Sequence, residues 1–507
     1  MTAAQHTAAG QEAVEGADVV VIGAGIAGLI VADRAAAAGL DVLVLDAADL
    51  PGGCVARHEV AGIALDAGAE SFATRSTAVA DLARDLGLGE DIVAPDPAGA
   101  WVAHRDGTWP LPRAGLLGIP TDLDDPSLQA ALGPEALARA RRDGSDPVPA
   151  ELRPGAPTPP SLGTVVRTRM GEQVLDRLVR PIVSGVHAAD PDQLDSQTVA
   201  PGLLAALEET GSLAAGVARL RSAAKAGSAV GSLRGGMHRL VEELVDRIED
   251  AGGRVRLGRA VTGLRRTGDA WQVATTATEP GSDAEDERHV LTDRVVLAAG
   301  AGTAIPLLTG VFPSLADLPA PVGAPVTLAT LVVRNRELND HPRGTGVLVG
   351  EDVPGVEAKA LTHATAKWDW LAERTGPDLH VLRLSYGRPG ESAARYADDA
   401  RVLETARRDA GTLLGLDLSG ANSEILDADV VRWPGSLPAA GPGHAGRVAR
   451  IRTAASAARA ELATGHGTGS GSAPVTFAVV GGWLAGNGLA AVVADSRAQA
   501  AHLFDSL

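Results

Sequence analysis

The sequence predicts an α/β fold in which one domain is assembled from separate parts of the chain, and three observations support this prediction. Residues 18–45 show the order strand, helix, strand around a glycine-rich turn. Residues 476–504 repeat part of that order, with a strand pattern, a glycine turn and a helix pattern. Residues 109–228 instead carry a Pro-rich stretch and amphipathic helical patterns. We therefore expect a mostly helical module to be inserted into a chain whose two ends fold together.

The first unit predicts a turn that binds a dinucleotide. Residues 18–22 are an apolar, β-branched run, residues 26–38 are Ala-rich, and residues 41–45 are again a strand pattern. Glycines in the intervening turn permit a tight bend, close approach of the backbone to a pyrophosphate, and close packing of helix on strand. A carboxylate at Asp46, after the second strand, can accept hydrogen bonds from ribose hydroxyls, so the unit predicts a Rossmann-type domain. The turn consists of Gly23, Ala24, Gly25, Ile26, Ala27 and Gly28.

The composition restricts the classes of function. The 507 residues include 63 acidic and 45 basic side chains, for a net charge of −18. A strongly acidic surface repels phosphate backbones and anionic lipids, which argues against nucleic-acid binding and against a polybasic membrane anchor. The 12 histidines include no close pair, so we expect no metal site. The single cysteine, Cys54, excludes an intrachain disulfide and is typical of a reduced, cytoplasmic protein.

Two segments bear on targeting. Residues 1–16 contain neither a basic run nor an apolar run, so we expect no secretory signal. Residues 475–494 carry no charge over 20 positions, which is long enough for a membrane span, but they include four glycines and an asparagine. We expect a strand, a glycine turn and a buried helix there, and no transmembrane segment.

The residues that follow Asp46 extend the pattern beyond the first turn. Gly52 and Gly53 come shortly after it, and the sequence Asp-Ala-Gly-Ala-Glu-Ser occupies residues 66–71. This order resembles the flavoprotein superfamily of amine oxidases, phytoene desaturases and protoporphyrinogen oxidases. The resemblance implies FAD as the dinucleotide. The sequence has no second Gly-x-Gly-x-x-Gly turn, which a reductase that also binds NAD(P)H would need.

Further blocks resemble the bacterial protoporphyrinogen and coproporphyrinogen III oxidases of haem synthesis within that superfamily. They occur in the expected order over nearly the whole chain. The blocks are DAGAESFATR (66–75), WPLPRAGLLGIP (109–120), SLGTVVRTRMGEQVLDRLVRPIVSGVHAADPDQLD (161–195), SLRGGMHRL (232–240), AKWDW (366–370), VVRWPGSLP (430–438) and GGWLAGNGLAAVV (481–493).

The resemblance also implies which residues contact the cofactor. Residues 23–28 would hold the pyrophosphate and Asp46 the ribose, while residues 68–71 line the cofactor. N–H groups at the helix start near residue 488 would stabilise the negative charge of a reduced flavin ring. Val261 would provide backbone contacts toward the adenine, and Trp433 would pack near the flavin. The positions implied beyond the first turn and Asp46 are Gly53, Gly68, Ala69, Glu70, Ser71, Val261, Trp433, Gly486, Asn487, Gly488 and Leu489.

Three regions follow from the resemblance and the patterns together. We expect a discontinuous FAD-binding domain, a substrate-binding domain with a mixed sheet, and the helical module over the mouth of the cavity. The FAD-binding domain would comprise residues 17–75, 229–308 and 440–507. The substrate-binding domain would comprise residues 76–108 and 309–439, and the helical module residues 109–228.

The implied reaction is the FAD-dependent oxidation of coproporphyrinogen III to coproporphyrin III, with dioxygen as acceptor and hydrogen peroxide as product. Protoporphyrinogen IX, in which two of the four propionates are replaced by vinyl groups, is the alternative substrate. Arginine suits the carboxylates of such a substrate because its guanidinium binds them bidentately, and the candidates are Arg75, Arg113 and Arg169. No residue is assigned as a catalytic acid or base. We expect loose membrane association at most, and transient contact with other enzymes of haem synthesis.

Other functions remain open on this fold. An amine oxidase would keep the glycine turn, but some members attach FAD through a C-terminal cysteine and many cage the amine between aromatic rings. The chain has no cysteine after Cys54 and only two tyrosines, which favours non-covalent FAD and another substrate. A carotenoid desaturase also needs an apolar tunnel, and an FAD-bound scaffold without activity is the non-enzymatic alternative.

Overall fold

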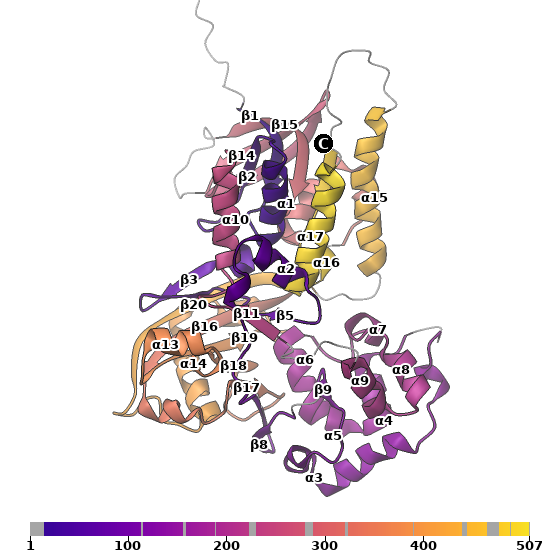
Figure 1. Cartoon of the computed structure of the whole chain (residues 1–507), viewed down its shortest axis with the longest axis vertical. Helices are drawn as coiled ribbons and strands as arrows, with labels where there is room; N and C mark the ends of the chain where they lie inside the picture. Colours follow the sequence, from indigo (N-terminus) through magenta and orange to yellow (C-terminus); the bar gives the residue numbers. More distant parts are fainter. Residues whose placement is uncertain are drawn as a thin grey trace, which may run out of the picture.

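The computed structural model contains three regions, which Figure 1 shows as an upper sheet with helices on both sides, a lower sheet and a separate cluster of helices. Arg113 and Asn487 lie outside the described residues. The structure describes residues 15–112, 115–155, 159–187, 189–222, 230–278, 287–319, 323–388, 390–438, 444–463, 476–486 and 488–505.

The first sheet has seven strands drawn from the beginning, the middle and the end of the described chain. Its order is β12-β2-β1-β15-β14-β13, and β21 pairs with the second half of β15. β1 runs parallel to both β2 and β15, as a Rossmann-type sheet requires. The strands are β1 (Glu15–Ile22), β2 (Val42–Leu45), β12 (Arg254–Arg256), β13 (Arg259–Thr267), β14 (Ala270–Ala277), β15 (Arg288–Leu297) and β21 (Thr476–Val479).

Helices cover both faces of the first sheet. Successive side chains of a strand point to opposite faces, and β1 shows this directly. Val19 and Val21 lie in one hydrophobic core, and Val20 and Ile22 lie in another. The first core includes α1 (Ile26–Ala37), α2 (Ala78–Asp85), α10 (Arg239–Asp250) and α17 (Leu489–Phe504), and the second includes α11 (Ala301–Val311), α15 (His444–Ala463) and α16 (Gly482–Ala485). The predicted α/β class and the discontinuous domain are confirmed.

The second sheet is mixed, as predicted. Its order is β20-β16-β19-β18-β17-β7-β8, with β7 parallel to β17 and the other neighbours antiparallel. One face packs against α14 (Asp399–Leu414) through a core that includes Leu382 and Leu384. The strands are β7 (Trp101–His104), β8 (Gly107–Pro110), β16 (Gly323–Arg334), β17 (Gly346–Val349), β18 (Ala360–His363), β19 (Leu379–Tyr386) and β20 (Glu424–Pro438), and α12 (Ala364–Lys367) and α13 (Asp369–Thr375) lie between β18 and β19.

The predicted helical module is present and has its own hydrophobic core. It is inserted between β8 and the return of the chain to the first sheet, as the sequence predicts. A π-helical stretch, Leu175–Val179, joins two of its helices. The module contains the hairpin β9 (Gly115–Leu116) and β10 (Ile119–Pro120) and the helices α3 (Pro126–Arg141), α4 (Leu162–Met170), α5 (Glu172–Val174), α6 (Arg180–His187), α7 (Ser196–Val199), α8 (Leu203–Thr210) and α9 (Leu213–Ser222).

One predicted domain boundary is wrong. The sequence assigns residues 76–108 to the substrate-binding domain, but α2 packs against the helices that cover one face of the first sheet. Val79 and Leu82 are buried there in the same core as α1 and α17. Only β7 and β8 of that segment join the second sheet. The remaining connections between the regions are the hairpin β3 (Arg57–Val60) and β4 (Ile63–Asp66) and the small sheet of β5 (Phe72–Ala73), β6 (Ile92–Val93) and β11 (Val230–Leu233).

The uncharged segment at residues 475–494 forms β21, α16 and the start of α17, in agreement with the predicted strand, turn and helix. None of the helices in the described ranges is long and apolar enough to cross a membrane. The cytoplasmic location stays a prediction from the sequence.

Candidate functional site

The glycine turn between β1 and α1 has the three properties that a pyrophosphate-binding turn needs. Gly23 has a φ of 111°, and a Cβ there would lie 2.8 Å from the backbone of Ala298. A Cβ on Gly28 would collide with the carbonyl oxygen of Gly23, so this glycine lets the helix pack on the strand. A Cβ on Gly25 would meet nothing within 4 Å. The protein therefore needs Gly23 and Gly28 for its own packing, whereas Gly25 borders open space, as expected where a ligand approaches.

Ala24, Ile26 and Ala27 complete this turn and the first turn of α1. All three side chains are buried in the core under the helix. α1 begins at Ile26 without a side-chain cap, so no side chain competes with a ligand for its first N–H groups. The N-terminus of a helix attracts anions such as phosphate through these groups and through its dipole. The turn therefore fits the pyrophosphate of a dinucleotide.

Asp46 lies directly beside the glycine turn. Its Oδ2 accepts a hydrogen bond from Ala24 N at 2.6 Å, and its Oδ1 accepts one from Ala48 N at 2.8 Å. Arg259 N donates to Asp46 O at 2.7 Å, which places the first residue of β13 against the end of β2. Val261 follows on β13 at an irregularity in its pairing with β14. The predicted ribose residue thus lies beside the start of the strand that carries the predicted adenine residue.

Two further glycine segments adjoin the first turn, one directly and the other through Cys54. Gly52 N donates to Ala24 O at 2.7 Å, and Gly52 and Gly53 have φ values of 107° and 57°. A Cβ on Gly68 would lie 2.5 Å from Cys54 O, and Ala69 N donates to that same oxygen at 2.8 Å. The structure therefore brings together residues 23–28, 52–54 and 66–71 into one wall, which we call the glycine wall. Long-range hydrogen bonds, which no local pattern reveals, build this wall.

A buried Asp–His pair fixes one end of the glycine wall. Asp66 Oδ1 accepts hydrogen bonds from His238 N at 2.9 Å and from His238 Nδ1 at 3.0 Å. Both side chains are less than a tenth exposed. The sequence alone predicts no role for His238, although this residue lies in the block SLRGGMHRL. A buried carboxylate needs hydrogen-bond donors. This need is the one signal that could have linked Asp66, in the block 66–75, to His238, in the block 232–240.

The second sheet reaches the glycine wall through Trp433 and a cluster of charged residues. Trp433 Nε1 donates to Ala67 O at 3.1 Å, so the indole of β20 lies against residues 66–71. Glu70 forms ion pairs with Lys367, at the end of α12, and with Arg383 on β19. Burial alone would raise the pKa of Glu70, but the two cations lower it to about 2. Glu70 is therefore ionised near neutral pH and cannot serve there as a proton acceptor of ordinary strength.

The C-terminal glycine segment lies next to the first turn. β21 pairs with β15, and Trp483 Nε1 of α16 donates to Ala299 O at 3.2 Å, close to the backbone that contacts Gly23. Gly486 has a φ of 106°, and a Cβ on Gly486 or Gly488 would meet nothing within 4 Å. Leu489 is the first residue of α17, which has no side-chain cap. This helix start offers N–H groups to a ligand in the same way as α1.

The two predicted substrate arginines that the structure describes, Arg75 and Arg169, lie in different regions of the fold. Arg75 is exposed in the turn after β5. Arg169 is wrong as a substrate contact because it is buried inside the helical module, with Nε donating to Asp143 Oδ1 at 2.8 Å. Its other guanidinium nitrogens donate to backbone oxygens of Asp143, Asp146, Pro147 and Gly211. Its guanidinium is fully used by the protein, so it has no donor left for a carboxylate.

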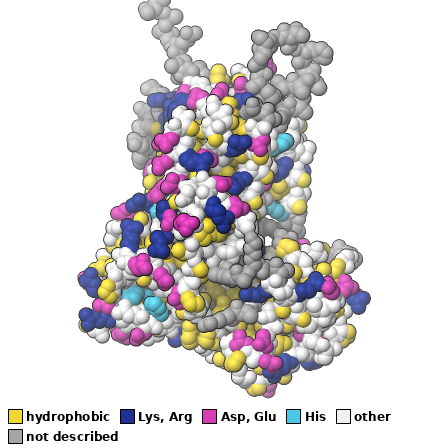
Figure 2. All heavy atoms as spheres, viewed as in Figure 1, with side chains coloured by type: hydrophobic (Ala, Val, Ile, Leu, Met, Phe, Trp, Pro, Cys, Tyr) yellow, Lys and Arg dark blue, Asp and Glu magenta, His cyan; other side chains and the backbone are white. Residues whose placement is uncertain are grey.

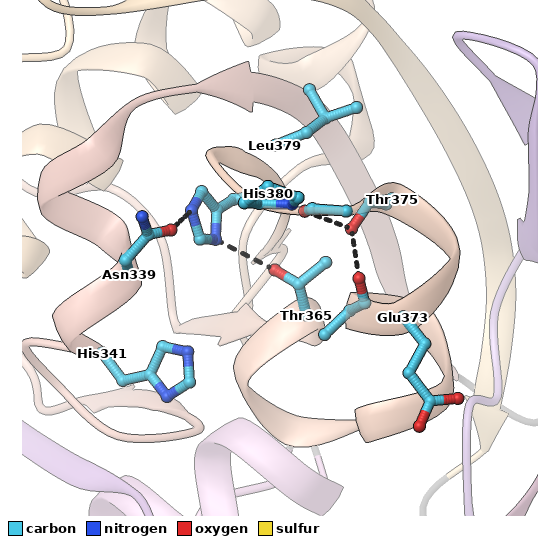
Figure 3. A pocket seen from close by; sticks show the side chains of 10 residues that line it. Asn339, His341, Thr365, Glu373, Thr375, Leu379 and His380 are labelled. Atoms are coloured by element: carbon cyan, nitrogen blue, oxygen red, sulfur yellow. Dashed lines mark hydrogen bonds between the residues drawn. The ribbon is translucent and has the colours of Figure 1, made fainter.

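A separate cavity of about 370 Å³ lies at the start of β19 beside α13, and its lining residues do not belong to the glycine wall (Figure 3). Its lining includes Asn339, His341, Thr365 and His380. Asn339 Nδ2 donates to Asp378 Oδ1 at 2.7 Å, so its Oδ1 must accept from His380 Nε2 at 3.0 Å. In the neutral form of His380, Nδ1 is then the acceptor, and it lies 3.0 Å from His363 Nε2. Burial lowers the pKa of both rings, so both imidazoles are neutral near neutral pH.

These neutral histidines predict a loss of stability in acid. Burial lowers the pKa of His363 to about 3 and that of His380 to about 4. Below the ordinary histidine pKa of about 6.5, the unfolded chain takes up protons that the folded chain refuses. At pH 5 the free energy of unfolding should therefore fall by about 2 kcal/mol for each histidine relative to pH 7.

Urea unfolding of the wild type, His363→Asn and the control His502→Gln at pH 7 and pH 5 measures this effect. We expect a smaller pH dependence for His363→Asn and an unchanged one for His502→Gln, whose side chain is exposed on α17. Equal pH dependence in all three proteins would contradict the assignment of neutral, buried histidines.

The comparison with known proteins gives the class of this protein. The profile of the family described as flavin containing amine oxidoreductase matches residues 26–467. A putrescine oxidase structure superimposes with a TM-score of 0.61 over 97% of this chain and 100% of that chain, at 15% identity, and shows the fold alone. The chain belongs to the flavin-containing amine oxidoreductases and is a flavin-dependent oxidoreductase.

Relatives that match most or nearly all of this chain identify a narrower group within the family. Coproporphyrinogen III oxidase of Mycobacterium leprae is 31% identical over 85% of this chain and 90% of its own length. The enzyme of the same name from Mycobacterium tuberculosis is 29% identical over 96% and 97%. A structure from Exiguobacterium sp. 255-15, provisionally described as a protoporphyrinogen oxidase, has a TM-score of 0.78 at 25% identity, covering 98% of this chain and all of that one. Within its superfamily, this chain belongs to the bacterial protoporphyrinogen and coproporphyrinogen III oxidases.

Proposed function

We propose that this protein oxidises coproporphyrinogen III to coproporphyrin III, with FAD as cofactor and dioxygen as electron acceptor. The observation that supports the substrate is the full-length similarity to several enzymes named coproporphyrinogen III oxidase. Protoporphyrinogen IX is the second candidate substrate, because a relative of 26% identity over 84% of this chain and 77% of its own length is a chloroplastic protoporphyrinogen oxidase of Nicotiana tabacum.

FAD is favoured over a smaller flavin because the glycine wall continues into a ribose-binding position. The turn at residues 23–28 would hold the pyrophosphate, and Asp46 would accept hydrogen bonds from the adenosine ribose. Val261 follows two residues after Arg259, whose N–H donates to Asp46 O, and it would offer its backbone to the adenine. We propose non-covalent attachment, because the sequence has no cysteine after Cys54.

The remaining residues would surround the flavin ring. Gly53 and residues 68–71 would line it from the glycine wall, and Trp433 would pack beside it from the second sheet. N–H groups at residues 486–489 would stabilise negative charge that develops on the ring. When bound, the flavin supplies the hydride-accepting chemistry. The protein's own part is to orient the substrate and to exclude water, and we assign no residue as an acid or a base.

The domain boundaries belong to this proposal with one change. Residues 17–75, 229–308 and 440–507 would bind FAD together with residues 78–88, whose buried side chains lie in the core of the first sheet. Residues 101–108 and 309–439 would form the substrate-binding domain. The module of residues 109–228 would cover the mouth of the cavity. We place the reaction in the cytoplasm, with transient contact to other enzymes of haem synthesis.

Purified protein mixed with coproporphyrinogen III in air tests the proposal. We expect porphyrin fluorescence to rise well above the rate of spontaneous oxidation, with oxygen consumed and peroxide formed. Heat-denatured protein supplies the control for spontaneous oxidation. Bound flavin without faster oxidation of either porphyrinogen would contradict the proposed function and favour a desaturase or a flavin-bound scaffold.

A further inference from the structure

Three charged side chains form a cluster where the second sheet meets the glycine wall. We call Glu70, Lys367 and Arg383 the Glu70 cluster. Arg383 Nη1 donates to Glu70 Oε2 at 2.8 Å, and its Nη2 donates to Gly68 O at 3.1 Å. Lys367 Nζ pairs with the other oxygen, Glu70 Oε1. The side chains of Glu70, Lys367 and Arg383 are only 17%, 18% and 8% exposed, so the cluster is largely shielded from water.

The Glu70 cluster carries more positive than negative charge. It combines two cations with one carboxylate that stays ionised near neutral pH. Within the described residues, Glu70 is the one acidic side chain that forms an ion pair with either cation. Arg383 Nε is buried with no hydrogen-bond partner there. A shielded charge without a counter-ion is unfavourable, so the cluster has a capacity for one further anion.

The cluster borders a face of the second sheet that is otherwise mostly apolar. Arg383 and Ser385 alternate with Leu382 and Leu384, which are buried against α14, so the first two point to the opposite face. On that face the next row across the strands is Leu328, Ser385, Ala360 and Leu348, and all four residues are half-buried. The cluster therefore lies at the edge of a partly open, mainly apolar surface.

The helical module closes the far end of the same surface. A Cβ on Gly185 of α6 would lie 2.8 Å from the Leu348 side chain and 3.9 Å from that of Ala360. Trp433 and Ala67 border the surface on the side of the glycine wall. Figure 2 shows a hollow with hydrophobic side chains where the region of the second sheet meets the helical module. An apolar ring system with charged groups on its rim fits such a surface.

We propose that Lys367 and Arg383, held in place by Glu70, bind a carboxylate on the rim of the porphyrinogen and thereby favour a substrate with four carboxylates over one with two. This inference rests on the proposed function. A propionate near Lys367 neutralises the excess charge of the cluster, whereas a vinyl group at the same place leaves it uncompensated. The sequence predicts such contacts at Arg75 and Arg113, and this inference adds Lys367 and Arg383 to them.

Variants of Lys367 test this inference. Lys367→Met leaves one cation paired with Glu70, so the cluster becomes neutral and the fold should be retained. Lys367→Arg keeps the charge. Arg334→Met is the matched control, because Arg334 is a cation of the same sheet in an exposed ion pair with Glu424. Lys367→Gln provides a second neutral variant should the methionine variant be unstable.

Binding of coproporphyrin III and of protoporphyrin IX, measured by quenching of protein fluorescence, gives a result that does not depend on turnover. We expect Lys367→Met to weaken binding of coproporphyrin III by about tenfold or more, the loss of one charge-assisted hydrogen bond, and that of protoporphyrin IX by less than about threefold. Lys367→Arg and Arg334→Met should stay within about threefold of the wild type. In turnover the KM for coproporphyrinogen III should rise with little change in kcat, and the flavin content should be unchanged.

An equal loss for both porphyrins, or no loss for either, would overturn this inference while leaving the proposed function in place. A wild type that binds neither porphyrin and oxidises neither porphyrinogen would overturn the proposed function, and this inference with it.

Discussion

Replacing Gly25 with alanine is expected to lower the affinity for the flavin cofactor by about tenfold or more without unfolding the protein. The added Cβ meets no protein atom within 4 Å, so packing does not oppose it. It occupies the space through which the turn would approach a pyrophosphate. Flavin content after gel filtration and the affinity of the apoprotein for added FAD measure the effect. The free energy of unfolding of the apoprotein should change by less than about 0.5 kcal/mol.

Gly302→Ala is the matched control for this variant. Gly302 lies in α11, and its added Cβ also meets nothing within 4 Å. It lies outside the glycine turn, so flavin affinity should stay at the wild-type level. A Gly25→Ala protein that binds FAD as tightly as Gly302→Ala would contradict the assignment of this turn to the pyrophosphate.

Replacing Arg169 with methionine is expected to lower the free energy of unfolding by about 3–5 kcal/mol, because it leaves the buried carboxylate of Asp143 without its charged partner. The side chains of Arg169 and Asp143 are 1% and 0% exposed. Asp143 also accepts hydrogen bonds from Leu213 N and Ala214 N, both at 2.9 Å, at the start of α9. The pair therefore joins α4 to α9 across the core of the helical module. Urea unfolding measures the loss.

Arg141→Met serves as the control because Arg141 pairs with Asp124 on the surface, where the two side chains are 52% and 83% exposed. Its loss should cost less than about 1 kcal/mol. If Arg169→Met instead kept full stability and raised the KM for a porphyrinogen, Arg169 would be a substrate contact, as the sequence analysis predicts, and the structural role would be wrong.

The sequence predicted the parts of the fold that depend on local patterns. Gly23, Gly25 and Gly28 lie within six consecutive positions between a strand and a helix, and each glycine answers a requirement of the turn itself. The C-terminal strand and helix were predicted for the same reason. The sequence does not show that α2 packs in the core of the first sheet, because an amphipathic helix pattern indicates which face is buried but not which sheet covers it.

Contacts between segments that are distant along the chain could not be predicted from the sequence. Arg169 is one of many arginines, and the residues next to it in the sequence do not show that its guanidinium pairs with Asp143, 26 positions away. Glu70 is separated by about 300 positions from both Lys367 and Arg383, which it contacts directly. His238 reaches Asp66 in the same way. The residue type determines which chemistry a side chain can perform, but the fold determines which side chains are already paired within the protein and which can bind a ligand.

Mixing the purified flavoprotein with coproporphyrinogen III in the absence of oxygen tests whether the flavin accepts electrons from the porphyrinogen. We expect the absorption of oxidised flavin to disappear on mixing, faster with coproporphyrinogen III than with protoporphyrinogen IX, and to return when air is admitted. Flavin that stays oxidised in the presence of both porphyrinogens would contradict the assignment of this site to porphyrinogen oxidation.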